Sequence, residues 1–203
     1  MKSLSLTTPH VIFVVGKPGV GKTQFATRFS DTFSAPFLEV DKLRDVLGEP
    51  TYSHDEQDVV DRLTLLQLNE LLKSKQTFLY EGGTEARIDR QNLAKFVRSK
   101  GYESIFVWVQ TDDDTAFTRS TRSTRSNKDK TLIIPEERYD YLVKRFTPPA
   151  SQDEQPVVIS GKHTYASQVR TVLKRLAEPN RPAVQPLKVP KRQVLKGNSI
   201  KIS

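Results

Sequence analysis

Cysteine is absent from this chain of 203 residues. Disulfide bonds, thiolate metal sites and cysteine nucleophiles are therefore excluded. Methionine and tryptophan occur once each, and aromatic residues make up 8% of the chain. Few aromatic residues alternate with basic ones, so the stacking surface of a single-strand nucleic-acid binder is not expected.

Long apolar runs are also missing. No run approaches the length that crosses a membrane, and the first residues lack the apolar segment of a signal peptide. We therefore expect a cytoplasmic protein without membrane contact, present as a monomer or a weak dimer. The length suits one domain with a substantial core.

The formal net charge of +8 is unevenly distributed. Residues 178–203 contain six basic residues and one acidic residue, which accounts for +5 of that charge. This segment has four prolines and no sustained periodicity, which predicts a basic, disordered tail. Residues 1–177 are expected to form the folded domain.

The most informative stretch is a phosphate-loop motif. Val11–Val15 is a short apolar run typical of a buried strand, and Gly16–Thr23 reads Gly-Lys-Pro-Gly-Val-Gly-Lys-Thr. A helix is expected over Gln24–Phe33. In this context backbone N–H groups surround phosphate oxygens, Lys22 reaches the β- and γ-phosphates, and Thr23 binds Mg²⁺. The nucleotide-binding residues predicted from the motif are Gly16, Lys17, Pro18, Gly19, Val20, Gly21, Lys22, Thr23 and Gln24. The alternative is a glycine turn that merely joins a strand to a helix.

Strands and helices alternate five times along the chain. The further strands are expected at 36–40, 77–80, 104–110 and 156–160, and the further helices at 42–47, 53–75, 86–100, 112–117, 135–146 and 164–177. This alternation predicts an α/β fold with a mostly parallel sheet covered on both faces. Ligands in such sheets bind beyond the carboxyl ends of the strands. The polar residues expected there are Lys22, Asp41, Glu81, Asp112 and His163.

A family resemblance adds to this pattern. The phosphate loop, Val40-Asp-Lys-Leu-Arg44, Tyr80-Glu-Gly-Gly-Thr84 and the spaced arginines after the fourth strand are together similar to the small P-loop kinases of the AAA type. This group includes polynucleotide 5′-kinase domains and zeta-toxin-like kinases. The resemblance implies a three-layer fold of five strands in the order 2-3-1-4-5, ATP and Mg²⁺ as cofactors, and an arginine-bearing lid at 118–134. It also implies that the loop at His163 lies against adenine. The family usually has Asp where this chain has Glu81.

Two carboxylates are candidates for the chemistry. Asp41 follows a strand end, where a carboxylate can orient the acceptor hydroxyl and take its proton, as in the kinases that this chain resembles. Its alternative role is the N-cap of a short helix. Glu81 is predicted to hold Mg²⁺ through water or to act as the base itself. Its alternative is a carboxylate satisfied by the amides of Gly82 and Gly83.

Three further positions are candidates for acceptor binding. Gly82 and Gly83 would let a substrate approach the backbone closely. Arg44 could hold an anionic group, or it could be a solvated surface arginine. Arg90 could meet an acceptor phosphate, or it could lie on a helix surface.

The run from Thr118 to Ser126 contains arginines at spacings of three. On a helix, Arg119, Arg122 and Arg125 would share one face. We expect a lid in which Arg119 and Arg125 stabilise the transferred charge and Arg122 contacts the nucleotide. The alternatives are a solvent-exposed basic segment and a nucleic-acid patch.

These features predict an ATP-dependent kinase whose acceptor is a small molecule, a nucleotide or a nucleic-acid 5′ end. A second hypothesis is a nucleotide-binding switch or ATPase without an acceptor. A third is a nucleic-acid-binding protein that uses the basic tail. No pair of histidines or carboxylate cluster has metal-ligand spacing, so Mg²⁺ is expected to arrive with the nucleotide.

Overall fold

The fold was analysed in a computed structural model, which describes residues 4, 6–122, 133–150 and 152–178. The strands are β1 (His10–Val15), β2 (Phe37–Glu39), β3 (Phe78–Glu81), β4 (Glu103–Gln110) and β5 (Val157–Ser160). The helices are α1 (Lys22–Phe33), α2 (Val40–Val46), α3 (His54–Lys73), α4 (Arg87–Ser99), α5 (Asp113–Thr121), α6 (Glu136–Arg145) and α7 (Tyr165–Ala177).

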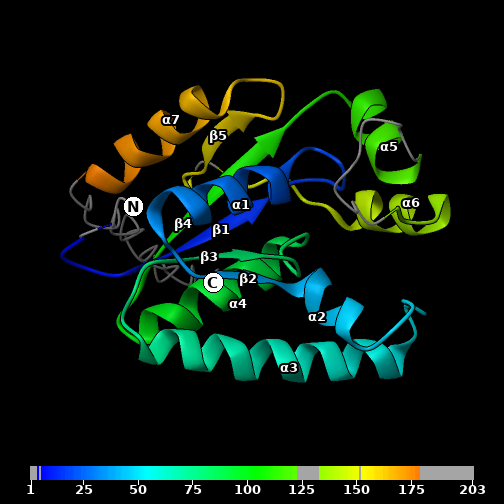
Figure 1. The fold of residues 1–203 in the computed structure, drawn as a ribbon, viewed down its shortest axis with the longest axis horizontal. Helices are drawn as coiled ribbons and strands as arrows, with labels where there is room; N and C mark the ends of the chain where they lie inside the picture. Colours follow the sequence, from blue (N-terminus) through cyan, green and yellow to red (C-terminus); the bar gives the residue numbers. More distant parts are fainter. Residues whose placement is uncertain (1–3, 5, 123–132, 151, 179–203) are drawn as a thin grey trace, which may run out of the picture.

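The five strands form one parallel sheet in the order β2-β3-β1-β4-β5, which confirms the predicted order. Figure 1 shows α7 on one side of the sheet and α3 and α4 on the other. The helices α2, α5 and α6 lie at the end toward which the strand arrows point (Figure 1). The carboxyl ends of all five strands therefore face one region of the molecule, as parallel pairing requires.

The central strand β1 is buried on both faces, and its side chains alternate between two cores. Ile12 and Val14 join the core under α1 and α7, whereas Val11, Phe13 and Val15 join the core under α3 and α4. A strand covered on both sides has no polar face, which explains the unbroken apolar run in its sequence.

Helix α1 carries three phenylalanines on its inner face, at spacings of four. Phe25, Phe29 and Phe33 are all buried in one core, with ring centroids 5.7 Å and 4.7 Å apart along the helix. Fully burying one such side chain contributes about 1.5–3 kcal/mol, so this stripe fixes α1 firmly on the sheet.

Several helices differ in their bounds from those expected, and α2 begins at Val40, two residues early. Helix α1 begins at Lys22, two residues earlier than expected, because Gly21 adopts a left-handed N-cap conformation that the motif supplies. Helix α5 extends to Thr121 rather than to Phe117. In α3, Val59 and Leu66 are exposed and do not belong to the inner face.

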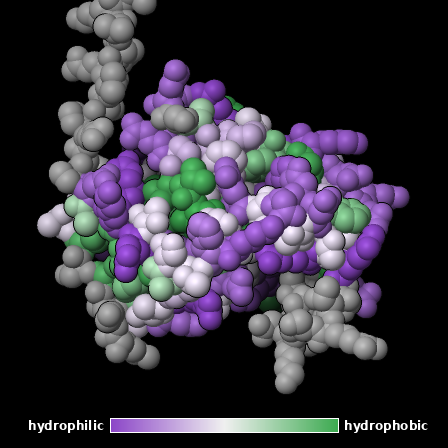
Figure 2. All heavy atoms as spheres, turned by 90° about the horizontal axis from the view of Figure 1, so that it is seen from above, coloured by the Kyte–Doolittle hydropathy of each residue, from purple (hydrophilic) through white to green (hydrophobic). Residues whose placement is uncertain are grey.

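The face of the molecule seen in Figure 2 is mainly polar. Figure 2 shows the molecule from above the view of Figure 1, with hydrophilic side chains over most of this face and a compact apolar patch among them. No helix in the described part of the chain combines the length and the apolar character needed to cross a membrane.

Candidate active site

The phosphate loop is shaped by close backbone approaches. Gly19 has a positive φ of 75°, and a Cβ there would lie 2.1 Å from the carbonyl oxygen of Ala116 on α5. At Gly161, which follows β5, a Cβ would lie 2.0 Å from the carbonyl oxygen of Val20. Glycine is required at both positions because a side chain would collide with backbone atoms. The loop is thus enclosed by the segments that follow β4 and β5.

Lys22 and Thr23 form the first turn of α1 and meet Glu81 at the end of β3. The Thr23 hydroxyl donates a hydrogen bond of 2.9 Å to Oε1 of Glu81, and Nζ of Lys22 lies 4.0 Å from the same oxygen. Lys22 also donates to the carbonyl oxygen of Lys17, at 3.0 Å. The motif lysine, the motif threonine and the β3 carboxylate therefore lie together, as the sequence predicts for the carboxyl edge of the sheet.

Glu81 is buried, with 5% of its surface exposed. Burial raises the pKa of this carboxyl to about 7, the Glu39 and Asp41 carboxylates push in the same direction, and Lys22 and Thr23 oppose the shift. Its Oε2 atom is buried and has no hydrogen-bond partner within the described structure. Oε1 of Glu81 thus accepts the hydrogen bond from Thr23, while Oε2 is available to a ligand.

These residues fit Mg²⁺. The ion prefers hard oxygen ligands and keeps several waters, and a threonine hydroxyl beside a carboxylate with an unpartnered buried oxygen supplies that chemistry. In the described part of the chain, no three His, Cys, Asp or Glu side chains gather closely enough to hold a metal. The alternative prediction, that the amides of Gly82 and Gly83 satisfy the Glu81 carboxylate, is wrong. The hydrogen-bond donor to this carboxylate is the Thr23 hydroxyl.

Asp41 lies close to the same edge. Glu39 is in register with Glu81, and Asp41 follows two residues later on the first turn of α2, with its side chain exposed. The N-cap of α2 is Glu39, so the alternative prediction that Asp41 caps this helix is wrong. Gly82 has a φ of 110°, and a Cβ there would lie 2.6 Å from Cβ of Val40. Gly82 therefore lets α2 pack against the end of β3, which holds Asp41 near the carboxyl edge of the sheet.

Arg44 was predicted either to hold an anionic group of the substrate or to be a solvated surface arginine, and its environment in the structure is neither. Its side chain is buried, with 4% of the residue exposed, so the solvated surface alternative is wrong. Its guanidinium forms an ion pair with Glu56 and donates a 2.7 Å hydrogen bond to Gln57. Both terminal nitrogens are therefore engaged within the protein, and we do not propose Arg44 as a substrate ligand.

Arg90 is fully buried, so the predicted helix-surface alternative is wrong. It pairs with both carboxylate oxygens of Glu154, at 2.5 and 3.2 Å, and donates to the carbonyl oxygens of Thr84 and Glu85 at 2.9 Å. This arginine ties the segment after β3 to the segment before β5. Because its donors are engaged inside the fold, Arg90 is a structural residue. The prediction that it meets an acceptor phosphate is therefore corrected.

The predicted lid begins on α5. Lys17 of the phosphate loop pairs with Asp113 at 2.7 Å, which links the loop to the first turn of α5. Arg119 is exposed in the last turn, whereas Arg122 is the C-cap, with extended backbone and its guanidinium 5.8 Å from the Phe117 ring centroid. The expectation that Arg119 and Arg122 share one helix face is wrong because the helix ends between them. Arg125 lies outside the described residues.

The loop after β5 borders an open pocket of about 650 Å³ at the ends of β4 and β5. His163 is exposed there, and Lys162 pairs with Asp112 at 2.5 Å. Asp112 also caps α5 by accepting a hydrogen bond from the amide of Thr115, and Lys162 lowers the pKa of its carboxyl. The segment predicted to meet adenine is therefore joined to the start of α5, beside the phosphate loop.

Sequence reasoning missed several partners. The sequence did not single out Glu154 or Glu56 as the partner of a buried arginine. Tyr52 and Arg138, whose guanidinium lies 4.8 Å from the Tyr52 ring centroid, were not singled out. A buried arginine needs a carboxylate partner, but the sequence gives no local signal of which one it meets.

A family model described as an AAA domain matches residues 11–149. Among solved structures, the chain is similar to a gluconokinase from Sinorhizobium meliloti 1021, with 19% identity, a TM-score of 0.58, and coverage of 84% of this chain and 93% of that one. It is also similar to the Mycobacterium tuberculosis APS kinase CysC in complex with AMPPNP and APS, with 14% identity, a TM-score of 0.59, and coverage of 84% and 99%.

A third similar structure comes from the Pnkp1/Rnl/Hen1 RNA repair complex, with 17% identity, a TM-score of 0.56, and coverage of 70% of this chain and 45% of that one. A search of curated proteins found no match. At these identities the likeness concerns the fold, which is that of P-loop kinases.

Proposed function

The chain belongs to the AAA-domain family of P-loop kinase-like proteins, and from this premise we propose that it transfers the γ-phosphoryl group of ATP to a hydroxyl acceptor. The observation that carries the proposal is the meeting of Lys22, Thr23 and Glu81 beside Asp41 at the carboxyl edge of the sheet. The family and the fold support a phosphotransfer kinase at this general level. The APS kinase structure, similar in fold, is a complex with the ATP analogue AMPPNP.

In this proposal the loop amides and Lys22 bind the β- and γ-phosphates of ATP. Thr23 and Glu81 would hold Mg²⁺, which neutralises phosphate charge when it is bound. Lys22 would move from the Lys17 carbonyl and the vicinity of Glu81 to the phosphates. Gly161, Lys162 and His163 would border the adenine.

The acceptor side is assigned to Asp41. The acceptor oxygen attacks the γ-phosphorus, the bond between that phosphorus and the β–γ bridging oxygen breaks, and ADP leaves with the electron pair. The hydroxyl proton passes to the carboxylate of Asp41, a residue that is exposed and does not occupy the N-cap position of α2. Gly82 and Gly83 would border the acceptor, and Arg119 would stabilise the transferred charge from α5.

Two alternatives stay open within this proposal. Glu81 could be the base, because its raised pKa of about 7 suits proton transfer near neutral pH. The acceptor could also be absent, in which case the protein is a nucleotide-binding ATPase or switch.

The decisive experiment measures transfer of labelled γ-phosphate from ATP to a panel of oligonucleotides, nucleotides and small hydroxyl compounds. Lys22→Ala is the background variant, because it removes the cation that contacts two phosphates. Transfer by the wild type that is lost in Lys22→Ala supports a kinase. ATP hydrolysis without transfer to any acceptor supports the ATPase, and unchanged turnover in Lys22→Ala would contradict the site.

A further inference from the structure

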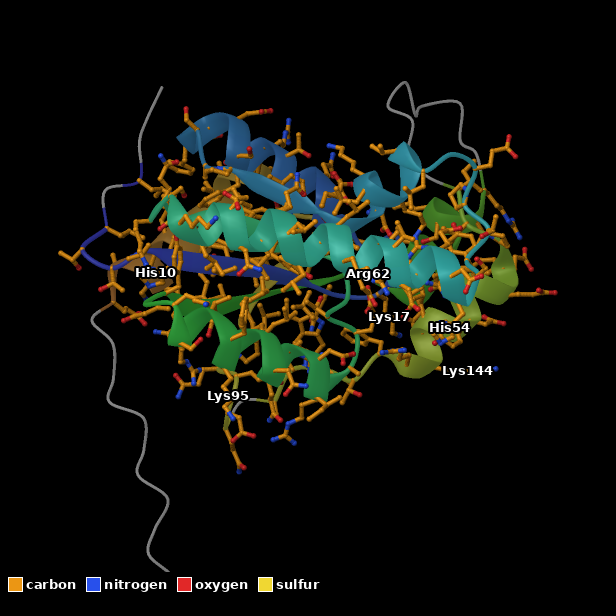
Figure 3. The ribbon with its side chains drawn as sticks, turned by 90° about the horizontal axis from the view of Figure 1, so that it is seen from below. His10, Lys17, His54, Arg62, Lys95 and Lys144 are labelled. Atoms are coloured by element: carbon orange, nitrogen blue, oxygen red, sulfur yellow. The ribbon has the colours of Figure 1, made fainter. Side chains whose placement is uncertain are left out.

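Tyr52 lies between two arginines at the carboxyl end of the sheet. The guanidinium of Arg44 is 5.4 Å from its ring centroid, and that of Arg138, on α6, is 4.8 Å away. Arg138 also lies 5.1 Å from the ring centroid of Tyr141 on its own helix. Figures 1 and 3 show α6 at the same end of the molecule as the start of α3, and Figure 3 places Lys144, His54 and Lys17 at that end, with His10 at the other.

The segment that carries Tyr52 is held by one carboxylate. Glu56 accepts hydrogen bonds from the amide and hydroxyl of Thr51 at 2.5 Å and from the amide of Tyr52 at 3.0 Å, in addition to its ion pair with Arg44. The Thr51 hydrogen bond, with the others, lowers the pKa of Glu56 to about 2, so this carboxylate stays ionised at neutral pH. Tyr52 is therefore fixed in position, with a left-handed φ of 54°.

The two arginines beside Tyr52 differ in how many of their N–H groups are already paired within the protein. The guanidinium of Arg44 is buried, and both of its terminal nitrogens are engaged by Glu56 and Gln57, although its Nε has no hydrogen-bond partner within the described structure. Arg138 is half-buried, forms no ion pair within the described structure, and has a buried Nε without a hydrogen-bond partner there. A buried donor without a partner is unfavourable, and a ligand that supplies an acceptor would remove that cost.

Stacking on aromatic rings uses the face of a guanidinium. Its edge N–H groups remain, and these are the groups that bind a carboxylate or a phosphate with two parallel hydrogen bonds. An anionic oxygen at this edge would also satisfy the Nε donor of Arg138.

Asp41 is part of the same surroundings. Burial raises the pKa of the Tyr52 hydroxyl, the Asp41 carboxylate raises it further, and the guanidinium groups of Arg138 and Arg44 oppose the shift. Asp41 lies one helical turn before Arg44 on α2, and Arg44 and Arg138 both lie against the Tyr52 ring. A compound that spans them would meet a carboxylate at one end and a cation at the other.

We propose that Arg138, stacked on Tyr52, binds an anionic group of the phosphate acceptor, and that Arg44 only positions Tyr52 through Glu56. The substrate class is then a hydroxyl compound that carries a carboxylate or a phosphate. This inference rests on the proposed function, because it places the acceptor hydroxyl at Asp41.

The test uses matched probes that differ in one anionic group: D-gluconate against D-glucose, and glycerol 3-phosphate against glycerol. The protein is first saturated with Mg²⁺ and AMPPNP, so that the phosphate loop is occupied, and probe binding is measured by calorimetry. We expect the anionic member of at least one pair to bind at least tenfold more tightly than its neutral twin. The pair that shows this preference distinguishes a carboxylate from a phosphate.

Arg138→Gln should abolish the preference by weakening the anionic probe at least tenfold, with AMPPNP binding unchanged. Arg62→Gln, which removes an exposed arginine of α3 (Figure 3), is the matched control and should change neither affinity by more than twofold. Arg138→Lys keeps the charge but not the planar edge, and should lose most of the affinity for the anionic probe while remaining folded.

The proposal is wrong if neither pair shows a preference, or if Arg138→Gln and Arg138→Lys both bind the anionic probe like the wild type. Failure of the proposed function is recognised separately in the transfer screen, where the wild type would then phosphorylate no acceptor. Transfer to an acceptor in that screen without an anion preference in calorimetry contradicts only the assignment of Arg138.

Discussion

The proposed site has a nucleotide half and an acceptor half, which are held in place by different kinds of contact. On the nucleotide half, Gly19 and Gly161 allow backbone atoms of three segments to approach one another. On the acceptor half, Arg44, Glu56 and Tyr52 form a network of side chains that fixes a loop. The first half is therefore sensitive to any added side-chain atom, whereas the second is sensitive to the loss of particular charged partners.

The largest expected effect is on the acceptor half. Asp41→Asn should keep ATP binding and slow phosphoryl transfer by about 10²- to 10⁴-fold, because the amide cannot take the hydroxyl proton. Steady-state transfer to the acceptor found in the screen measures kcat, and calorimetry measures ATP affinity.

Glu81→Gln separates the two carboxylates. If Glu81→Gln is inactive without loss of Mg²⁺-dependent ATP binding while Asp41→Asn is active, the roles assigned here are reversed. Full activity in both variants would mean that neither carboxylate is the base.

The next effect tests the nucleotide half. Gly19→Ala should weaken ATP binding by about 10²-fold, since its Cβ would meet the Ala116 carbonyl and distort the loop that positions the phosphates. Gly48→Ala is the matched control: Gly48 also has a positive φ, of 119°, but nothing lies within 4 Å of its Cβ position. It shares the backbone strain of about 1–2 kcal/mol without the collision. Equal ATP affinity in the two variants would contradict the close-approach explanation.

A third effect concerns stability rather than chemistry. Arg90→Met should destabilise the fold by about 3–5 kcal/mol, because it leaves the Glu154 carboxylate buried and unpaired. Thermal unfolding measures this loss, at about 2–4 °C per kcal/mol for a protein of this size. Adding Glu154→Leu should recover much of the loss, and ATP affinity below the unfolding temperature should stay unchanged. A single variant as stable as the wild type would show that the buried pair contributes little.

The difference between the halves also explains how far the sequence could be interpreted. The strand order that the family resemblance implies is confirmed by the sheet. Lys22 and Glu81, both expected at the carboxyl ends of the strands, lie together there. The phosphate loop is a local pattern, because each glycine adopts a conformation that its neighbours in sequence determine. A short motif is therefore enough to identify it.

The environments of Arg44 and Arg90 could not be predicted in this way. Their partners, Glu56 and Glu154, lie 12 and 64 residues away in sequence, and charged residues are common enough that many pairings fit the sequence equally well. The statistical expectation that an arginine is exposed was wrong for both. The roles of Asp41 and Arg119 stay predictions, and Arg125 lies outside the described residues.

The smallest effect tests Glu81 through pH. Burial raises the pKa of this carboxyl from 4.5 to about 7, so the folded protein holds the proton more tightly than the unfolded chain between these values. Its contribution to stability is therefore full below about pH 4.5 and is lost as the pH rises through 7. Glutamine stays neutral and avoids the burial of a charge.

Glu81→Gln should thus match the wild type in melting temperature near pH 4.5 and exceed it at pH 8. The corresponding gain in the free energy of unfolding at pH 8 is on the order of 1–3 kcal/mol. Differential scanning calorimetry without nucleotide, from pH 4.5 to 8, measures the trend. With Mg²⁺ and ATP present the order at pH 8 should reverse, because the ionised carboxylate that destabilises the free protein is the form that would hold the metal. A difference that is independent of pH would show that Glu81 is ionised throughout this range, and a missing reversal would remove Glu81 from the metal site.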